Sequence, residues 1–163
     1  MDYHDDGDVD LFGATSGDQK DYLFQNLGQC RFDRVTNNAL VQIPDGTTAQ
    51  AWGDYDNDGD LDVFLGNWNQ TRLLYQNLGG GAFQLDPAGP VGKPSDAYGV
   101  AGWADYDNDG WLDLFLAQGG GLCRMWHNRG DGMLEEVLTG SPVQEARGMG
   151  MGWGDYDNDG FAD

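Results

Sequence analysis

The sequence predicts an all-β fold, and three observations lead to that prediction. The 163-residue chain carries an acidic motif that recurs about every fifty residues, the mark of a repeat architecture. Between the motifs, short apolar runs are bounded by Gly, Asn and Asp, which is typical of strands and tight turns. No segment keeps a 3.6-residue apolar period long enough for an ordinary helix. Four short strands in about fifty residues make one β-propeller blade, so we expect about three blades of four antiparallel strands.

The acidic motif fixes the phase of the repeat. The hexapeptide DYDNDG starts at Asp54, Asp105 and Asp155, and the variant DYHDDG starts at Asp2. The starts lie 52, 51 and 50 residues apart. We interpret 1–163 as a partial propeller with an acidic loop in each blade, whose repeat units are 2–53, 54–104, 105–154 and the start of a fourth at 155–163. A superhelical solenoid is the alternative architecture.

Four strands are expected around each motif. In the second unit they are Thr48–Trp52, Leu61–Leu65, Arg72–Gln76 and Ala82–Leu85. The strand that enters the motif is expected again at Gly99–Trp103 and Gly148–Trp153. Each unit also has an aromatic-x-Asn turn before a Gly-rich corner: Phe24-Gln25-Asn26, Tyr75-Gln76-Asn77 and Trp126-His127-Asn128. We expect His127 to be structural, because it occupies a repeated slot.

Aromatic residues recur once per unit beside the motif. Trp52, Trp103 and Trp153 stand two residues before it, and Tyr55, Tyr106 and Tyr156 stand within it. Large aromatic side chains supply much of the buried area that a Gly-rich chain needs. We therefore expect them to pack between neighbouring blades.

The acidic residues are concentrated rather than spread. The chain has 28 acidic and 8 basic residues, a formal charge of −20, and eighteen of the acids lie in four nine-residue windows that begin at the motifs. This charge disfavours binding to nucleic acid and to anionic membranes. No run approaches the roughly 18 apolar residues of a membrane span. Cys30 and Cys123 sit at different places in the repeat, so no disulfide framework is expected.

Alternate aspartates in the second window predict a calcium loop. Calcium takes six to eight oxygen ligands, and a Gly such as Gly59 lets the backbone turn sharply. We assign side-chain oxygens to the first, third, fifth and ninth positions, Asp54, Asp56, Asp58 and Asp62. The seventh position, Asp60, would supply its backbone carbonyl, because Trp and Phe occupy that position in the third and fourth loops.

The same assignment extends to the other windows, giving up to four Ca²⁺ sites. The third loop offers Asp105, Asp107, Asp109 and Asp113 with the carbonyl of Trp111, and the fourth offers Asp155, Asp157, Asp159 and Asp163 with the carbonyl of Phe161. The first offers Asp2, Asp6, Asp8 and Asp10.

The first loop departs from the pattern at His4, which stands in the third position. Imidazole is a poor ligand for a hard ion, so this site is expected to bind calcium most weakly. A transition-metal site at His4 is the alternative.

These residues resemble the FG-GAP/VCBS repeat family, the calcium-loop blades also found in the integrin α-chain β-propeller. The string Trp-[Gly/Ala]-Asp-Tyr-Asp-Asn-Asp-Gly is nearest to the family in Trp52–Leu65 and Trp103–Leu116, and the first unit departs at His4. The sequence is also similar to bacterial VCBS proteins and to cartilage acidic protein-like relatives with an ASPIC/UnbV domain. The resemblance implies a propeller of about seven blades, structural calcium, and a role in adhesion or binding.

We therefore expect a calcium-binding module that is extracellular, at the cell surface or periplasmic, because weak calcium sites would stay empty in the cytosol. Its ligand would be a protein or a carbohydrate, and no enzymatic activity is expected. The alternative is the propeller portion of a secreted polysaccharide-degrading enzyme. Its catalytic carboxylates would come from Asp86, Asp96, Glu135, Glu136 and Glu145, which form no recognisable arrangement.

Three periods are too few for a closed ring. We expect the chain to be a segment of a longer protein. Head-to-tail self-association through open blade edges is the alternative.

Overall fold

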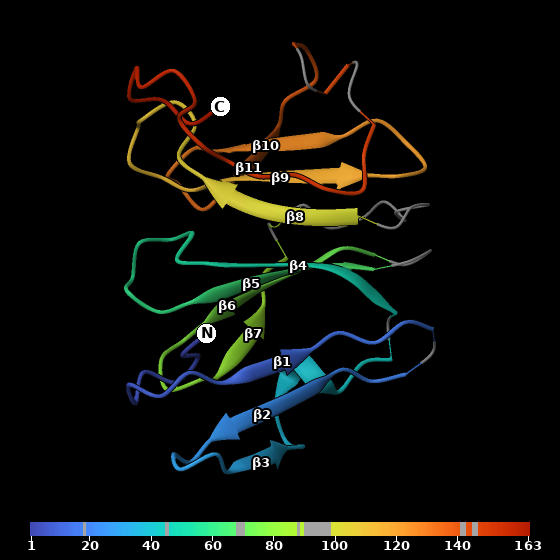
Figure 1. The fold of residues 1–163 in the computed structure, drawn as a ribbon, viewed down its shortest axis with the longest axis vertical. Coiled ribbons are helices and arrows are strands. Elements are labelled where there is room, and N and C mark those ends of the chain that lie inside the picture. Colours follow the sequence, from blue (N-terminus) through green and yellow to red (C-terminus); the bar gives the residue numbers. More distant parts are fainter. Residues whose placement is uncertain are drawn as a thin grey trace.

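The computed structural model describes residues 1–17, 19–44, 46–67, 71–87, 89, 99–140, 143–144 and 147–163. It contains three antiparallel sheets that stack along the long axis of the molecule (Figure 1). One short 3₁₀ helix, η1 (Ala39–Val41), accompanies them. The predicted all-β fold of partial propeller blades is confirmed. Within the described ranges, no helix has the length and apolar character needed to cross a bilayer.

The two complete sheets share one order of strands. The second sheet runs β4 (Thr47–Gly53), β5 (Asp62–Asn67), β6 (Leu73–Asn77) and β7 (Phe83–Leu85). The third runs β8 (Gly99–Ala104), β9 (Asp113–Gln118), β10 (Arg124–Asn128) and β11 (Leu134–Glu136). The first contains β1 (Leu11–Gly13), β2 (Tyr22–Asn26) and β3 (Phe32–Val35). Each complete sheet therefore joins the strand before an acidic loop to the three strands after it.

One predicted strand is wrong. Gly148–Trp153 forms no strand, although the equivalent segments are β4 and β8. A strand needs a neighbour to accept and donate its ladder hydrogen bonds. Among the described residues, one backbone hydrogen bond joins this segment to the third sheet: the Gly148 N–H donates to the Gln118 carbonyl of β9 at 3.3 Å. Side chains still hold the segment in place, because Met151 and Trp153 pack against the cluster around Phe115.

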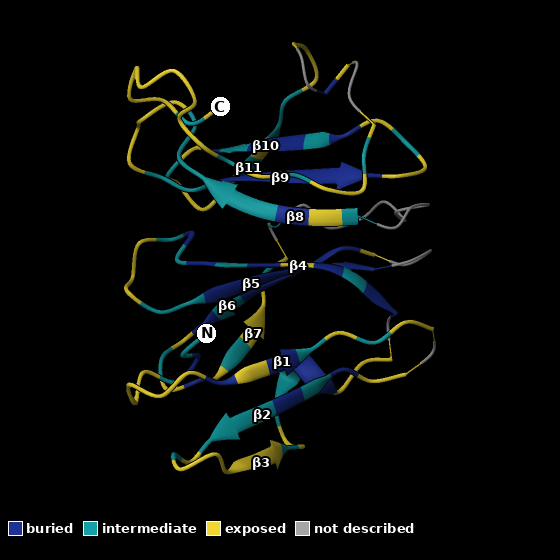
Figure 2. Ribbon diagram, viewed as in Figure 1, coloured by how far each residue is buried: buried dark blue, intermediate teal, exposed yellow. Residues whose placement is uncertain are grey.

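The core lies between the sheets. All six residues of β5 and all six of β9 are buried, because each of these strands is covered on both faces (Figure 2). Val63 and Leu65 of β5 face the first sheet, where they pack with Leu23. Phe64 points the other way and packs with Leu114 of the third sheet. The near-continuous apolar runs after each motif follow from this two-sided burial.

Trp52, Tyr55 and Trp103 pack between neighbouring sheets, whereas Tyr106 and Trp153 pack with Phe115 on the outer face of the third sheet. The ring of Trp52 lies 5.7 Å from that of Phe12, and the ring of Trp103 stacks at 6.0 Å on that of Tyr55. The Trp103 indole N–H also donates to the Ala51 carbonyl at 3.2 Å. The prediction is wrong for Tyr156, which is 82% exposed. No described sheet lies beyond the fourth loop to cover its ring.

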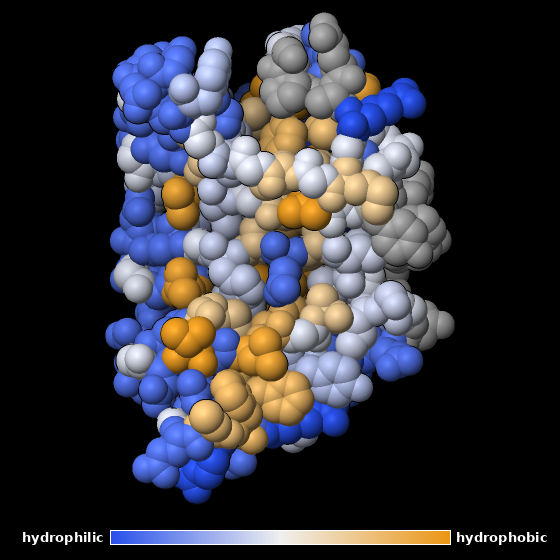
Figure 3. Space-filling model, viewed as in Figure 1, coloured by the Kyte–Doolittle hydropathy of each residue, from blue (hydrophilic) through white to orange (hydrophobic). Residues whose placement is uncertain are grey.

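The four acidic loops lie along one edge of the stack, and the first three lie beside the start of the outgoing strands β1, β5 and β9 (Figure 1). Hydrophilic atoms are gathered along this edge in Figure 3, whereas apolar atoms appear toward the middle of the same view. The repeat thus places its charged segments in a single column, away from the cores between the sheets.

Candidate metal centres

Each acidic loop is closed by its first aspartate. In the second loop the Asp54 carboxylate accepts hydrogen bonds from the backbone N–H groups of Asp58 and Gly59, both at 3.0 Å. The other three loops repeat this pair of bonds from the carboxylates of Asp2, Asp105 and Asp155, at distances between 2.8 and 3.3 Å. A carboxylate that accepts two backbone N–H groups turns the chain back on itself, as a cation-binding loop requires.

The fourth and sixth residues explain the Asn and the Gly of the motif. Asn57 has φ of 57° and Gly59 has φ of 98°, and the third and fourth loops repeat both values closely. Asn and Gly adopt this left-handed region more readily than other residues do. In the first loop Asp5 takes the Asn position, with φ of 57°.

The ninth aspartate is buried and ties the loop to its sheet. Asp62 is fully buried and accepts hydrogen bonds from Tyr55 N–H at 3.0 Å and from Asn77 N–H at 2.8 Å. Asp10 and Asp113 repeat both contacts. Burial raises the pKa of the Asp62 carboxyl to about 7, with the charges of Asp56 and Asp58 adding to the effect and the two hydrogen bonds opposing it. The two donors only partly offset the loss of water, and a cation bound beside this carboxylate would lower its pKa.

Side-chain ligand atoms converge in every loop. Three such atoms lie within 4.8 Å of one another in each of these groups: Asp2–His4–Asp6, Asp54–Asp56–Asp58, Asp105–Asp107–Asp109 and Asp155–Asp157–Asp163. The first and third positions take part in all four groups. The donor set is entirely carboxylate in the last three, which suits calcium.

Some predicted ligands lie outside these groups. Among the described residues, five predicted ligands have side chains that join none of them: Asp8, Asp10, Asp60, Asp62 and Asp159. The ninth position therefore joins its loop group only in the fourth loop, through Asp163, and Asp113 joins a separate cluster with Asp107. Trp111 and Phe161 occupy the seventh position of the third and fourth loops, where the backbone carbonyl is the predicted ligand. The backbone N–H of each donates to the fifth aspartate of its loop, at 2.9 Å, and the predicted role of its carbonyl stays a prediction.

The sequence reasoning missed one side chain per blade. The middle residue of each aromatic-x-Asn turn faces the third position of the loop: the Gln76 amide donates to Asp56, and the Gln25 amide lies 2.7 Å from His4 Nε2. His127 Nδ1 lies 3.1 Å from Asp113 and 3.4 Å from Asp107. His127, expected to be structural, therefore forms a further cluster with both aspartates. The recurrence of Gln, Gln and His in phase was the available signal.

The asparagine of the same turn connects neighbouring loops. The Asn77 amide donates to the Tyr3 carbonyl in the first loop at 2.8 Å, and the Asn128 amide donates to the Tyr55 carbonyl in the second at 2.7 Å. The loop residue Asn57 donates onward to the Gly110 carbonyl at 3.0 Å. Asn108 likewise donates to the Gly160 carbonyl at 2.8 Å. The second loop is therefore hydrogen-bonded directly to the third and the third to the fourth, whereas the first loop is bonded to the Asn77 turn of the second blade.

The raised pKa of Asp62 predicts a pH-dependent calcium affinity. A carboxyl in an unfolded chain titrates near 3.9, so the folded, metal-free protein holds this proton to a higher pH. The stability of the metal-free protein should therefore fall as pH rises from about 4 through about 7. Calcium must displace the proton, so its affinity should rise between pH 6 and pH 8. Calorimetric titration at both pH values checks this, and equal affinities would contradict it.

Of the carboxylates proposed for an enzyme, the described ones, Asp86, Glu135 and Glu136, join none of the metal-binding groups. Asp86 accepts a hydrogen bond from the Tyr55 hydroxyl at 2.7 Å, Glu136 pairs with Arg124, and Glu135 lies 3.9 Å from Arg129. Asp96 and Glu145 lie outside the described residues. The absence of enzymatic activity stays a prediction.

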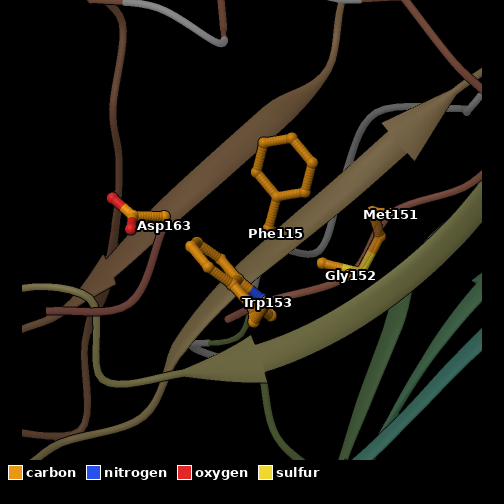
Figure 4. A pocket seen from close by; sticks show the side chains of 5 residues that line it. All are labelled: Phe115, Met151, Gly152, Trp153 and Asp163. Carbon is orange, nitrogen blue, oxygen red and sulfur yellow. The ribbon is translucent and has the colours of Figure 1, made fainter. Parts of the chain in front are cut away.

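An apolar cavity of about 150 Å³ lies beside the third sheet, lined by Phe115, Met151, Gly152, Trp153 and Asp163 (Figure 4). The Asp163 carboxylate also accepts a hydrogen bond from Tyr156 N–H at 3.0 Å. The cavity therefore lies between β9 and the segment that leads into the fourth loop.

Comparison with known proteins places this geometry in a family. The family model described as an FG-GAP-like repeat matches residues 2–65, 54–116 and 105–163, so each match runs from one acidic loop to the next. Cartilage acidic protein 1 of Mus musculus is 31% identical over 142 residues, which cover 79% of this chain and 22% of that protein. The Homo sapiens protein is also 31% identical over 142 residues, covering 79% of this chain and 21% of its own length. The Xenopus tropicalis protein is 33% identical over 131 residues, covering 72% and 20%. The chain spans about a fifth of the length of these relatives, and it belongs to the FG-GAP-like repeat family.

Proposed function

We propose that the chain is a calcium-binding module of an extracellular or cell-surface protein, with a structural Ca²⁺ in its acidic loops. The observation that supports this most is the convergence of three carboxylate oxygens in each of the second, third and fourth loops, with the first and third positions shared by all three. Like charges held this close repel one another unless a cation lies between them. Membership of the repeat family and likeness to cartilage acidic protein 1 support the extracellular setting.

The role of the ions is to hold the blades together so that the remaining surface can bind a protein or carbohydrate ligand. The loops lie away from the cores. In the second and third blades, the buried ninth aspartate accepts one hydrogen bond from a backbone N–H of its loop and one from a backbone N–H of its sheet, and so connects the two. A bound ion would therefore stabilise the start of the outgoing strand as well as the loop. Because unfolded chain lacks such a preformed site, ion binding adds directly to folding stability.

Substitution of one predicted ligand tests the proposal. Asp58→Ala removes a carboxylate from the second group, so the calcium affinity of that site should fall at least about tenfold, or about 1.4 kcal/mol. Asp60→Ala is the matched control in the same loop, because its carbonyl remains and its side chain joins no described group. Asp5→Ala is the control in the first loop. Calorimetric titration with Ca²⁺ measures all three, and equal losses would contradict the ligand assignment.

A further inference from the structure

We propose that the first acidic loop is a zinc-type transition-metal site in which His4 supplies a nitrogen ligand. The proposal rests on the proposed function, because it takes this loop to be one of four metal-binding loops. It assigns the first loop a different ion from the others. Three features of His4 support the proposal: its position in the loop, the orientation of its ring through Nδ1, and the possible ligands beside Nε2.

His4 occupies a ligand position. Asp2, His4 and Asp6 stand at the first, third and fifth positions of the loop, and their ligand atoms lie within 4.8 Å of one another. The same positions in the second loop hold Asp54, Asp56 and Asp58, which form the equivalent group. The substitution of Asp by His therefore changes the donor set from three carboxylates to two carboxylates and one imidazole. Imidazole suits zinc and its neighbours, whereas calcium prefers oxygen.

A buried carboxylate orients the imidazole ring. Asp10 is 5% exposed, and its carboxylate is fixed by the backbone N–H groups of Tyr3 and Asn26. His4 Nδ1 lies 2.9 Å from the same carboxylate, so Nδ1–H donates to it. Metal-binding histidines commonly donate their second ring N–H to a carboxylate, which fixes the tautomer and makes the other nitrogen more basic. With the proton on Nδ1, Nε2 is the nitrogen that would bind the metal, in place of its contacts with Asp6 and Gln25.

The second ring nitrogen of His4 lies beside another carboxylate of the loop. His4 Nε2 lies 2.9 Å from an Asp6 carboxylate oxygen. Zinc binds nitrogen and oxygen at about 2.0–2.2 Å, so two adjacent ligands of one ion stand about 3 Å apart or slightly more. The Gln25 amide also lies 2.7 Å from Nε2, and a rotation of that amide would present its oxygen to the same ion. The His4 side chain is 15% exposed, which leaves a path for an ion to enter.

His127 provides a comparison within the chain. Its Nδ1 also contacts the buried ninth aspartate of its loop, Asp113, but the same nitrogen is the one that faces Asp107. Its ring packs edge-on against Tyr106. A ring nitrogen that donates to Asp113 has no lone pair for a metal. In His4 the two ring nitrogens contact different carboxylates, Asp10 through Nδ1 and Asp6 through Nε2, whereas the contacts of His127 with its two carboxylates both use Nδ1.

Nuclear magnetic resonance of the two imidazoles tests the proposal, because the chain has only two histidines. The protein is titrated with Zn²⁺ in the presence of excess Ca²⁺, and ¹⁵N spectra follow both rings. His4→Asp restores the aspartate of the other loops and removes the proposed nitrogen ligand. Asp56→His is the reciprocal variant, because Gln76 and Asp62 occupy the places of Gln25 and Asp10. His127→Gln assigns the resonances.

The expected result is a metal-dependent shift of the His4 Nε2 resonance at one equivalent of Zn²⁺, with His127 unchanged. His4→Asp should weaken zinc binding at least about tenfold and add one calcium site, and Asp56→His should create a second zinc-sensitive ring. Unchanged His4 resonances, or equal weak shifts of both rings, would overturn the zinc site even if Ca²⁺ binds the other loops. Zinc binding at His4 with no calcium binding elsewhere would overturn the proposed function instead.

Discussion

Removal of calcium by a chelator should lower the melting temperature of the protein by about 10 °C or more. An ion present at a hundred times its dissociation constant stabilises a folded chain by about 2.7 kcal/mol, and three loops offer all-carboxylate groups. For a chain of this size, each kcal/mol changes the melting temperature by about 2–4 °C. Without the ion, the carboxylates also repel one another within each loop. Differential scanning calorimetry with and without EDTA measures the change.

Restoring Ca²⁺ should return the original transition, whereas Mg²⁺ should not, because it requires near-ideal octahedral geometry and releases its waters reluctantly. A melting curve that chelation leaves unchanged, together with no ion density among the aspartates of a calcium-soaked crystal, would contradict the proposed role of the loops.

Asn77→Ala should destabilise the protein by about 3 kcal/mol or more. The Asn77 side chain is fully buried, and its amide donates to the carbonyls of Tyr3 at 2.8 Å and Leu61 at 3.2 Å, while its oxygen accepts from Gly79 N–H at 3.2 Å. Each buried polar group left without a partner costs about 1–3 kcal/mol. Chemical denaturation of the calcium-loaded variant measures the loss of unfolding free energy.

Asn57→Gly is the control for this substitution. Asn57 is exposed and makes one amide bond to Gly110, and Gly keeps the left-handed backbone that the position requires. Its cost should stay near 1 kcal/mol. Equal losses from the two variants would show that burial of the asparagine contributes nothing.

Local patterns predicted most of the fold. The strands β4 to β8 were predicted to within two residues, because their apolar runs and flanking turn residues are contiguous in sequence. The segment Gly148–Trp153 carries the same pattern and forms no strand, because pairing depends on a neighbour that the pattern does not contain. Tyr156 is exposed for the same reason.

The candidate sites show the same division between local and distant contacts. Alternate spacing within nine residues brought Asp54, Asp56 and Asp58 together as expected. The contacts of Gln76 with Asp56 and of His127 with Asp113 join residues 20 and 14 positions apart, so they depend on strand register. The hydrogen bond from Asn77 to Tyr3 spans 74 positions and depends on how two sheets stack.

The hydrogen bonds between neighbouring loops mean that the ions should not bind independently. An ion that orders the second loop also fixes Asn57, and therefore the Gly110 carbonyl in the third loop. Asn108 passes the same restraint to the fourth loop. Filling of these three loops should be cooperative, with a binding isotherm steeper than that of separate sites. The first loop has Asp5 in place of the asparagine, and a carboxylate cannot donate, so that loop should fill without this forward link.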